Sequence, residues 1–115
     1  MNINFGEKMY KSVVMEGINA YKKMYEDLSD NYDDAYWENI SRFCKKLSDE
    51  DKKAFYNIIE MVLEDATAHV LGILDGVCSL AGGGAFDSEV IIDGENMEND
   101  LQESFLVYID ENERF

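Results

Sequence analysis

Apolar residues recur at spacings of three and four through most of the first 81 residues, the pattern of helices that bury one side. The first such stretch is Glu7–Leu28. Gly17 lies within its apolar stripe and lowers the helix propensity there, so we expect another helix to approach closely at this position. The stripe consists of Tyr10, Val14, Ile18, Tyr21, Tyr25 and Leu28.

Two more helices are expected before the chain changes character. The second starts at a cap formed by Asp33 or Asp34 and runs through Leu47. The third starts at Asp49, because the Ser48 hydroxyl can accept a hydrogen bond from a free amide of the first turn. The second helix is predicted to turn Trp37, Ile40, Phe43, Cys44 and Leu47 inward.

The third helix is predicted to be the longest, from Asp49 to Leu80. Its second half, His69–Leu80, is apolar on several faces, which is typical of a central helix that is covered on more than one side. We expect Gly82-Gly83-Gly84 to end it, since glycine adopts the left-handed backbone that stops helices. Its main apolar stripe consists of Phe55, Ile59, Val62, Ala66, Val70, Ile73 and Val77.

After the glycines, Val90–Ile92 is a short β-branched run that ends at the turn signal Asp93-Gly94, and it predicts one short strand. A strand needs a partner for its backbone groups. The candidates are Ile3–Phe5, Phe105–Ile109 or the same strand of a second subunit.

The last segment has β character but keeps helical spacing, and we predict a helix from Asp100 to Glu111 that Asn99 or Asp100 can cap. The expected fold is therefore α-dominant, with a minor α+β character. It has three to four helices around one core and a short strand or hairpin near the C-terminus. We expect one compact domain over residues 1–115, with 1–81 helical and 82–115 forming an acidic strand and a C-terminal helix.

Charge is distributed unevenly along the chain. The first 53 residues carry eleven acidic and nine basic side chains, whereas the rest carry fourteen acidic side chains and one basic one. Because phosphate binding needs clustered Lys and Arg, this distribution argues against nucleic acid as a ligand and against anionic membranes. An apolar fraction of 46% argues that the acids decorate a folded protein rather than a disordered one.

Location and cofactors are constrained by what the sequence lacks. It has no apolar run of membrane-spanning length and no signal peptide pattern, so we expect a cytoplasmic protein. Cys44 and Cys78 form no CxxC motif and are expected to be reduced thiols. No zinc spacing, P-loop, dinucleotide fingerprint or EF-hand loop is present, so we predict no cofactor and no catalytic residue.

Two pairs of ionisable residues on the third helix could nevertheless take part in catalysis or metal binding. Asp65 lies one turn before His69, a spacing that could position an imidazole for general-base work or metal binding. We interpret His69 instead as a histidine packed in the core. Glu60 and Glu64 could hold a metal ion, but they lie opposite the main apolar stripe, which predicts a solvated face. A small metal-dependent hydrolase that uses all four residues remains an alternative.

The leading hypothesis is a non-enzymatic module that binds a basic protein, in the manner of an immunity protein or an antitoxin. Acids next to apolar residues suit such an interface, because carboxylates speed association and apolar contacts hold the complex. A second alternative is a subunit that self-associates through Val90–Ile92 or through an exposed helix stripe. The predicted partner-binding residues are Asp87, Glu89, Asp93, Glu95, Glu98, Asp100 and Glu103.

Overall fold

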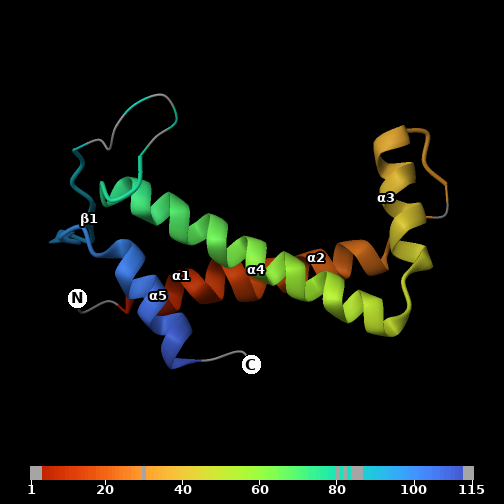
Figure 1. Ribbon diagram of the computed structural model, residues 1–115, viewed down its shortest axis with the longest axis horizontal. Helices are drawn as coiled ribbons and strands as arrows, with labels where there is room; N and C mark the ends of the chain where they lie inside the picture. Colours follow the sequence, from red (N-terminus) through yellow and green to blue (C-terminus); the bar gives the residue numbers. More distant parts are fainter. Residues whose placement is uncertain (1–3, 30, 80, 82, 84–86, 113–115) are drawn as a thin grey trace.

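The structure is a computed structural model that describes residues 4–29, 31–79, 81, 83 and 87–112. Helices dominate and a small antiparallel sheet lies near the C-terminal end, so the predicted α-dominant fold class is confirmed (Figure 1). In chain order the elements are α1 (Phe5–Met9), the π-helix η1 (Tyr10–Met15), α2 (Glu16–Glu26), α3 (Ala35–Lys46), α4 (Asp49–Leu74), β1 (Ile91–Ile92), β2 (Glu95–Asn96) and α5 (Leu101–Glu111).

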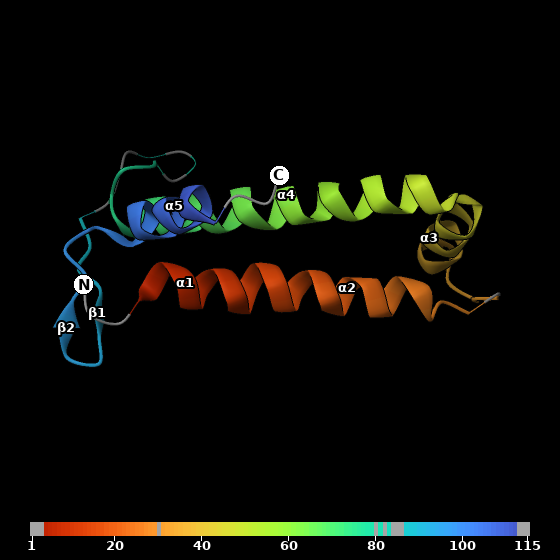
Figure 2. The same cartoon turned by 90° about the horizontal axis from the view of Figure 1, so that it is seen from below.

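The helices form two layers. Figure 2 shows α1, η1 and α2 in one layer and α4 with α5 in the other, while α3 stands at the far end of both. The molecule is elongated, with extents of 49 × 34 × 23 Å and a radius of gyration of 17.7 Å. A compact chain of this length has a radius of gyration of about 13 Å. The division of the chain into domains stays a prediction.

The first predicted helix is present as the continuous run of α1, η1 and α2, and it approaches α4 closely at Gly17. A Cβ atom placed on Gly17 would lie 3.2 Å from Leu63 Cδ1 of α4. The close approach that the sequence predicted at this glycine is therefore confirmed. Gly6 in α1 lies closer still to α5, because a Cβ there would overlap the carbonyl group of Ser104.

Both predicted helix caps in the middle of the chain are present. The Asp34 carboxylate accepts a hydrogen bond from the Tyr36 amide at 2.8 Å and starts α3. The Ser48 hydroxyl accepts one from the Asp51 amide at 3.1 Å and starts α4. Side chains of these short polar residues satisfy amides that have no partner within the helix. The predicted inward position of Phe43 is wrong, since about half of this side chain is exposed.

The predicted end of the third helix is also wrong, because α4 stops at Leu74 rather than Leu80. Gly76 has a φ of 78°, and its amide donates to the Ile73 carbonyl while the Val77 amide donates to the Gly72 carbonyl. This pair of bonds is the Schellman arrangement, in which one left-handed glycine closes the last turn. Gly82 and Gly84 of the predicted stop lie outside the described residues.

The partner of the predicted strand is the segment directly after the turn. Ile91 pairs with Asn96 and Ile92 with Glu95, in antiparallel register. Asp93 and Gly94 both have positive φ, as a two-residue hairpin turn requires. The hairpin replaces the three partners proposed from the sequence, of which Ile3 lies outside the described residues.

The buried core lies where α1, η1, the second half of α4 and α5 meet. The helix predicted for the C-terminal segment is present as α5. Its residues Leu101 and Phe105 are fully enclosed in this core. At the opposite end of the molecule, aromatic side chains pack together. Phe55 of α4 contacts Tyr25 of α2 and Phe43 of α3, at ring-centroid distances of 5.4 and 5.6 Å. The core cluster comprises Phe5, Val14, Leu71, Met97, Leu101 and Phe105.

Candidate functional site

The predicted partner-binding acids lie along one stretch, from the segment before β1 to the first turn of α5, at one end of the molecule (Figure 1). We call this stretch, residues 87–103, the acidic end. None of its seven carboxylates forms an ion pair with another residue that the structure describes. Glu95 and Asp100 are half-buried, and the exposed members are Asp87, Glu89, Asp93, Glu98 and Glu103.

Hydrogen bonds fix the shape of the acidic end. The Asn96 side-chain amide donates to Glu89 Oε1 at 2.6 Å and links β2 to the segment before β1. The Asn96 side-chain oxygen Oδ1 accepts a hydrogen bond from the Glu98 backbone amide at 2.8 Å, which holds the turn after β2. Met97 is buried in the core and its amide donates to the Val90 carbonyl. The exposed carboxylates are therefore carried by a segment that is anchored on both sides.

Asp100 does not cap α5, although the sequence predicted this role for it or for Asn99. Asp100 makes no side-chain hydrogen bond at the helix start. The cap is Asp75, just beyond the end of α4, whose carboxylate oxygens accept from the Leu101 amide at 3.1 Å and the Gln102 amide at 2.7 Å. Asp75 is buried, so this carboxylate joins α4 to α5 inside the protein.

The four residues of the hydrolase alternative do not converge. Glu64 is only 4% exposed and faces the core, and Glu60 is half-buried and accepts a hydrogen bond from the Tyr10 hydroxyl at 3.4 Å. The predicted solvated face for this pair is wrong. Asp65 and His69 lie on the exposed side of α4, so the core position predicted for His69 is wrong as well. Among the described residues no group of three or more His, Cys, Asp and Glu side chains is placed to hold a metal ion.

These corrections share one physical reason: from Val62 onward, α4 packs against the rest of the protein mainly through the side opposite Val62. Val62 is 56% exposed and Val70 is 54% exposed, whereas Leu71 is buried. At about 100° per residue, Leu71 and Glu64 lie roughly opposite Val62. The predicted coverage of the second half of α4 on several sides is therefore wrong.

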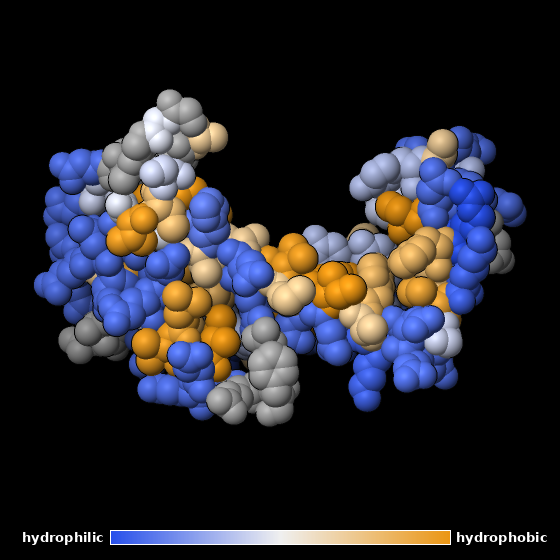
Figure 3. All heavy atoms as spheres, in the orientation of Figure 1, coloured by the Kyte–Doolittle hydropathy of each residue, from blue (hydrophilic) through white to orange (hydrophobic). Residues whose placement is uncertain are grey.

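The exposed apolar side of α4 is a candidate contact surface that the sequence alone placed in the core. Figure 3 shows hydrophobic side chains gathered along α4, between the acidic end and α3. A large exposed apolar surface on a folded protein marks an interaction site. The α4 outer face, as we name it, consists of Ile58, Met61, Val62, Ala66, Val70 and Leu74.

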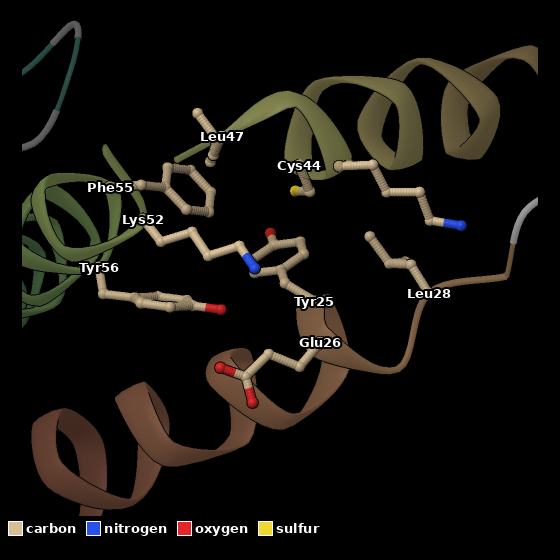
Figure 4. A pocket seen from close by; sticks show the side chains of 9 residues that line it. Tyr25, Glu26, Leu28, Cys44, Leu47, Lys52, Phe55 and Tyr56 are labelled. Atoms are coloured by element: carbon tan, nitrogen blue, oxygen red, sulfur yellow. The ribbon is translucent and has the colours of Figure 1, made fainter. Parts of the chain in front are cut away.

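A small pocket lies between α2, α3 and the start of α4. Figure 4 shows the Lys52 side chain reaching toward the Tyr25 ring, with Cys44 on the wall of the pocket. Its volume of about 160 Å³ is below the roughly 300–1,000 Å³ of ligand sites. Burial raises the pKa of the Cys44 thiol, which disfavours the thiolate that a nucleophile requires. The lining residues are Tyr25, Glu26, Leu28, Cys44, Lys45, Leu47, Lys52, Phe55 and Tyr56.

No helix in the described part of the chain has the length and apolar character needed to cross a lipid bilayer. Comparison with known proteins gave no match to this chain among family models, curated proteins or solved structures.

Proposed function

We propose that this protein is a non-enzymatic binding module that recognises a basic protein through its acidic end. The observation that carries the proposal is a set of exposed carboxylates on and around an anchored hairpin, with no ion pair to other described residues. A one-signed field of this kind attracts a partner of opposite charge and accelerates its approach.

An exposed apolar side chain within the acidic end supports the same proposal. Ile91 of β1 is 60% exposed and lies between Glu89 and Asp93 in the sequence. Carboxylates steer the encounter over a long range, but their pairs with exposed cations add little stability in water. A desolvated apolar contact at the centre of a charged rim supplies short-range affinity. Ile91 is the residue in the hairpin that can make this contact.

The test compares two variants of equal net charge. The first changes four exposed carboxylates of the acidic end to amides, which lowers the formal net charge from −15 to −11. Asparagine tolerates the positive φ of position 93, and a glutamine at position 89 can still accept from Asn96, so the hairpin is retained. The substitutions are Asp87→Asn, Glu89→Gln, Asp93→Asn and Glu98→Gln.

The matched control changes four exposed acids that lie elsewhere, with the same final charge of −11. A basic protein captured from the host at low salt should bind the wild-type chain and the control at similar rates. The acidic-end variant should associate on the order of tenfold more slowly. Equal slowing of both variants would show that only net charge matters and would refute the proposal. The control substitutions are Glu16→Gln, Asp27→Asn, Asp33→Asn and Glu50→Gln.

A further inference from the structure

We propose that the α4 outer face is covered by a second copy of this chain, in an antiparallel two-fold pairing centred on Ala66. This inference concerns a different surface from the acidic end, so either proposal can fail without the other. It rests on four observations: the symmetry of the exposed side chains, the amount of exposed surface, the distribution of charge and one polar pair beside the apolar ridge.

Except for Met61, the residues of the α4 outer face are symmetric in sequence about Ala66. Val62 and Val70 lie four residues before and after it, and Ile58 and Leu74 lie eight residues before and after it. Residues four apart form a continuous ridge on a helix, and two such ridges pack with the helices crossing at about 50°. A two-fold axis at Ala66 puts Val62 of one copy against Val70 of the other. The small alanine side chain at the crossing point allows the two helices to approach closely.

The single chain exposes more surface than a folded monomer of its mass, as expected if a partner covers part of it. The accessible surface is 8005 Å². A folded monomer of 13.2 kDa has an accessible surface of about 6,400 Å². The excess of about 1,600 Å² exceeds the roughly 800 Å² that each partner buries in an interface of standard size. A helix face that stays half-exposed along most of its length is an obvious place to bury that excess.

The distribution of charge favours the antiparallel arrangement over the parallel one. The acidic end follows the C-terminal end of α4, whereas the other end carries the exposed Lys45, Lys46 and Lys53 among its acids. Parallel copies would place two acidic ends side by side, where like charges repel. Antiparallel copies place the acidic end of one chain next to the nearly balanced end of the other.

One polar pair beside the α4 outer face also fits this arrangement. Asp65 and His69 are exposed and lie on the same flank of the apolar ridge. In an antiparallel helix pair, each flank meets the same flank of the other copy. A two-fold axis near Ala66 therefore brings Asp65 of one chain close to His69 of the other, where the carboxylate can accept a hydrogen bond from the imidazole. The arrangement gives two such contacts, one on each side of the axis.

The first experiment measures mass by sedimentation equilibrium at low and high protein concentration. The wild-type chain should approach twice its mass of 13.2 kDa as the concentration rises. Val62→Lys should remain at the mass of one chain, because the lysine places a charge within the apolar contact. Val107→Lys is the matched control, since Val107 is exposed on α5, outside the α4 outer face, and the same charge is added.

Two results of that experiment would overturn the proposal: a wild-type chain of single mass at every concentration, or a Val62→Lys variant that dimerises like the wild type. Circular dichroism checks that each variant is folded. If Val62→Lys loses helix content, Val70→Lys takes its place, because Val70 is exposed to nearly the same extent.

The second experiment tests the orientation by oxidative cross-linking, in a chain that carries Cys44→Ala and Cys78→Ala. Val62→Cys and Val70→Cys chains should form disulfide-linked dimers when they are mixed. Each variant alone should form few, because the two copies of one position lie about 12 Å apart along the helix axis. A parallel pair would instead link each variant to itself, and that result would refute the antiparallel arrangement.

Discussion

Replacing Asp75 should destabilise the whole protein, because this one carboxylate joins two helices within the core. Its oxygens accept hydrogen bonds of 3.1 and 2.7 Å from the first two amides of α5, and the residue is 6% exposed. Hydrogen bonds to a charged group contribute about 1.5–3 kcal/mol each. The negative charge also interacts favourably with the positive end of the α5 dipole.

Asp75→Ala should therefore cost about 3 kcal/mol, since it removes both acceptors and leaves two amides without their partner. Asp75→Asn keeps the volume and one acceptor oxygen but turns an NH₂ group toward the second amide, so it should cost about 2 kcal/mol. A chain of this length has a total stability of about 6–17 kcal/mol. The alanine variant thus loses a large part of it.

Urea denaturation at one fixed protein concentration measures both variants. With a slope of about 2 kcal/mol per molar urea, the midpoint of Asp75→Ala should fall by about 1.5 M. Asp100→Ala is the control, because Asp100 precedes the same helix but makes no side-chain cap bond. An Asp75→Asn stability within about 0.5 kcal/mol of the wild type, or an Asp100→Ala cost as large as that of Asp75→Ala, would refute this role of Asp75.

Two further predictions use residues that differ in their surroundings. Gly6→Ala should lower the midpoint of thermal unfolding, because the added Cβ would overlap the α5 backbone. Gly17→Ala should leave the midpoint unchanged or raise it, because the added Cβ meets only a flexible leucine side chain and alanine has the higher helix propensity. In the native protein, iodoacetamide at mildly alkaline pH should modify Cys78 faster than Cys44, because Cys44 is buried and burial raises its pKa. Mass spectrometry of the digested protein measures how fast each cysteine is modified, and equal rates for Cys44 and Cys78 would contradict this prediction.

Local signals predicted the elements of this fold well. The caps at Asp34 and Ser48, the turn at Asp93-Gly94 and the close approach at Gly17 each depend on a few neighbouring residues. The stop of α4 is also a local signal, but the sequence offers two candidate stops, the single Gly76 and the triple glycine at 82–84, and the helix ends at the first. A single glycine in the left-handed conformation commonly ends a helix.

The packing of α4 could not be derived from its periodicity. A helix that carries apolar residues on more than one side has several possible buried faces, and the hydrophobic pattern does not choose between them. Val62 and Val70 of the most regular stripe are exposed in the single chain, and Glu64 is buried instead. Asp75 was missed for a related reason, because it caps a helix that begins 26 residues later in the sequence. Contacts of this kind are set by the tertiary structure.

Salt should affect the two proposed interfaces in opposite directions. Binding of a basic protein at the acidic end depends on attraction between opposite charges, so raising the salt concentration should weaken it. Self-association through the α4 outer face joins two chains of formal charge −15, and salt screens the repulsion between them, so the dimer should become tighter. Sedimentation equilibrium and binding kinetics at low and high salt measure the two effects on one preparation. A dimer that weakens with salt would show that charge pairs, rather than Val62 and its neighbours, hold the two chains together.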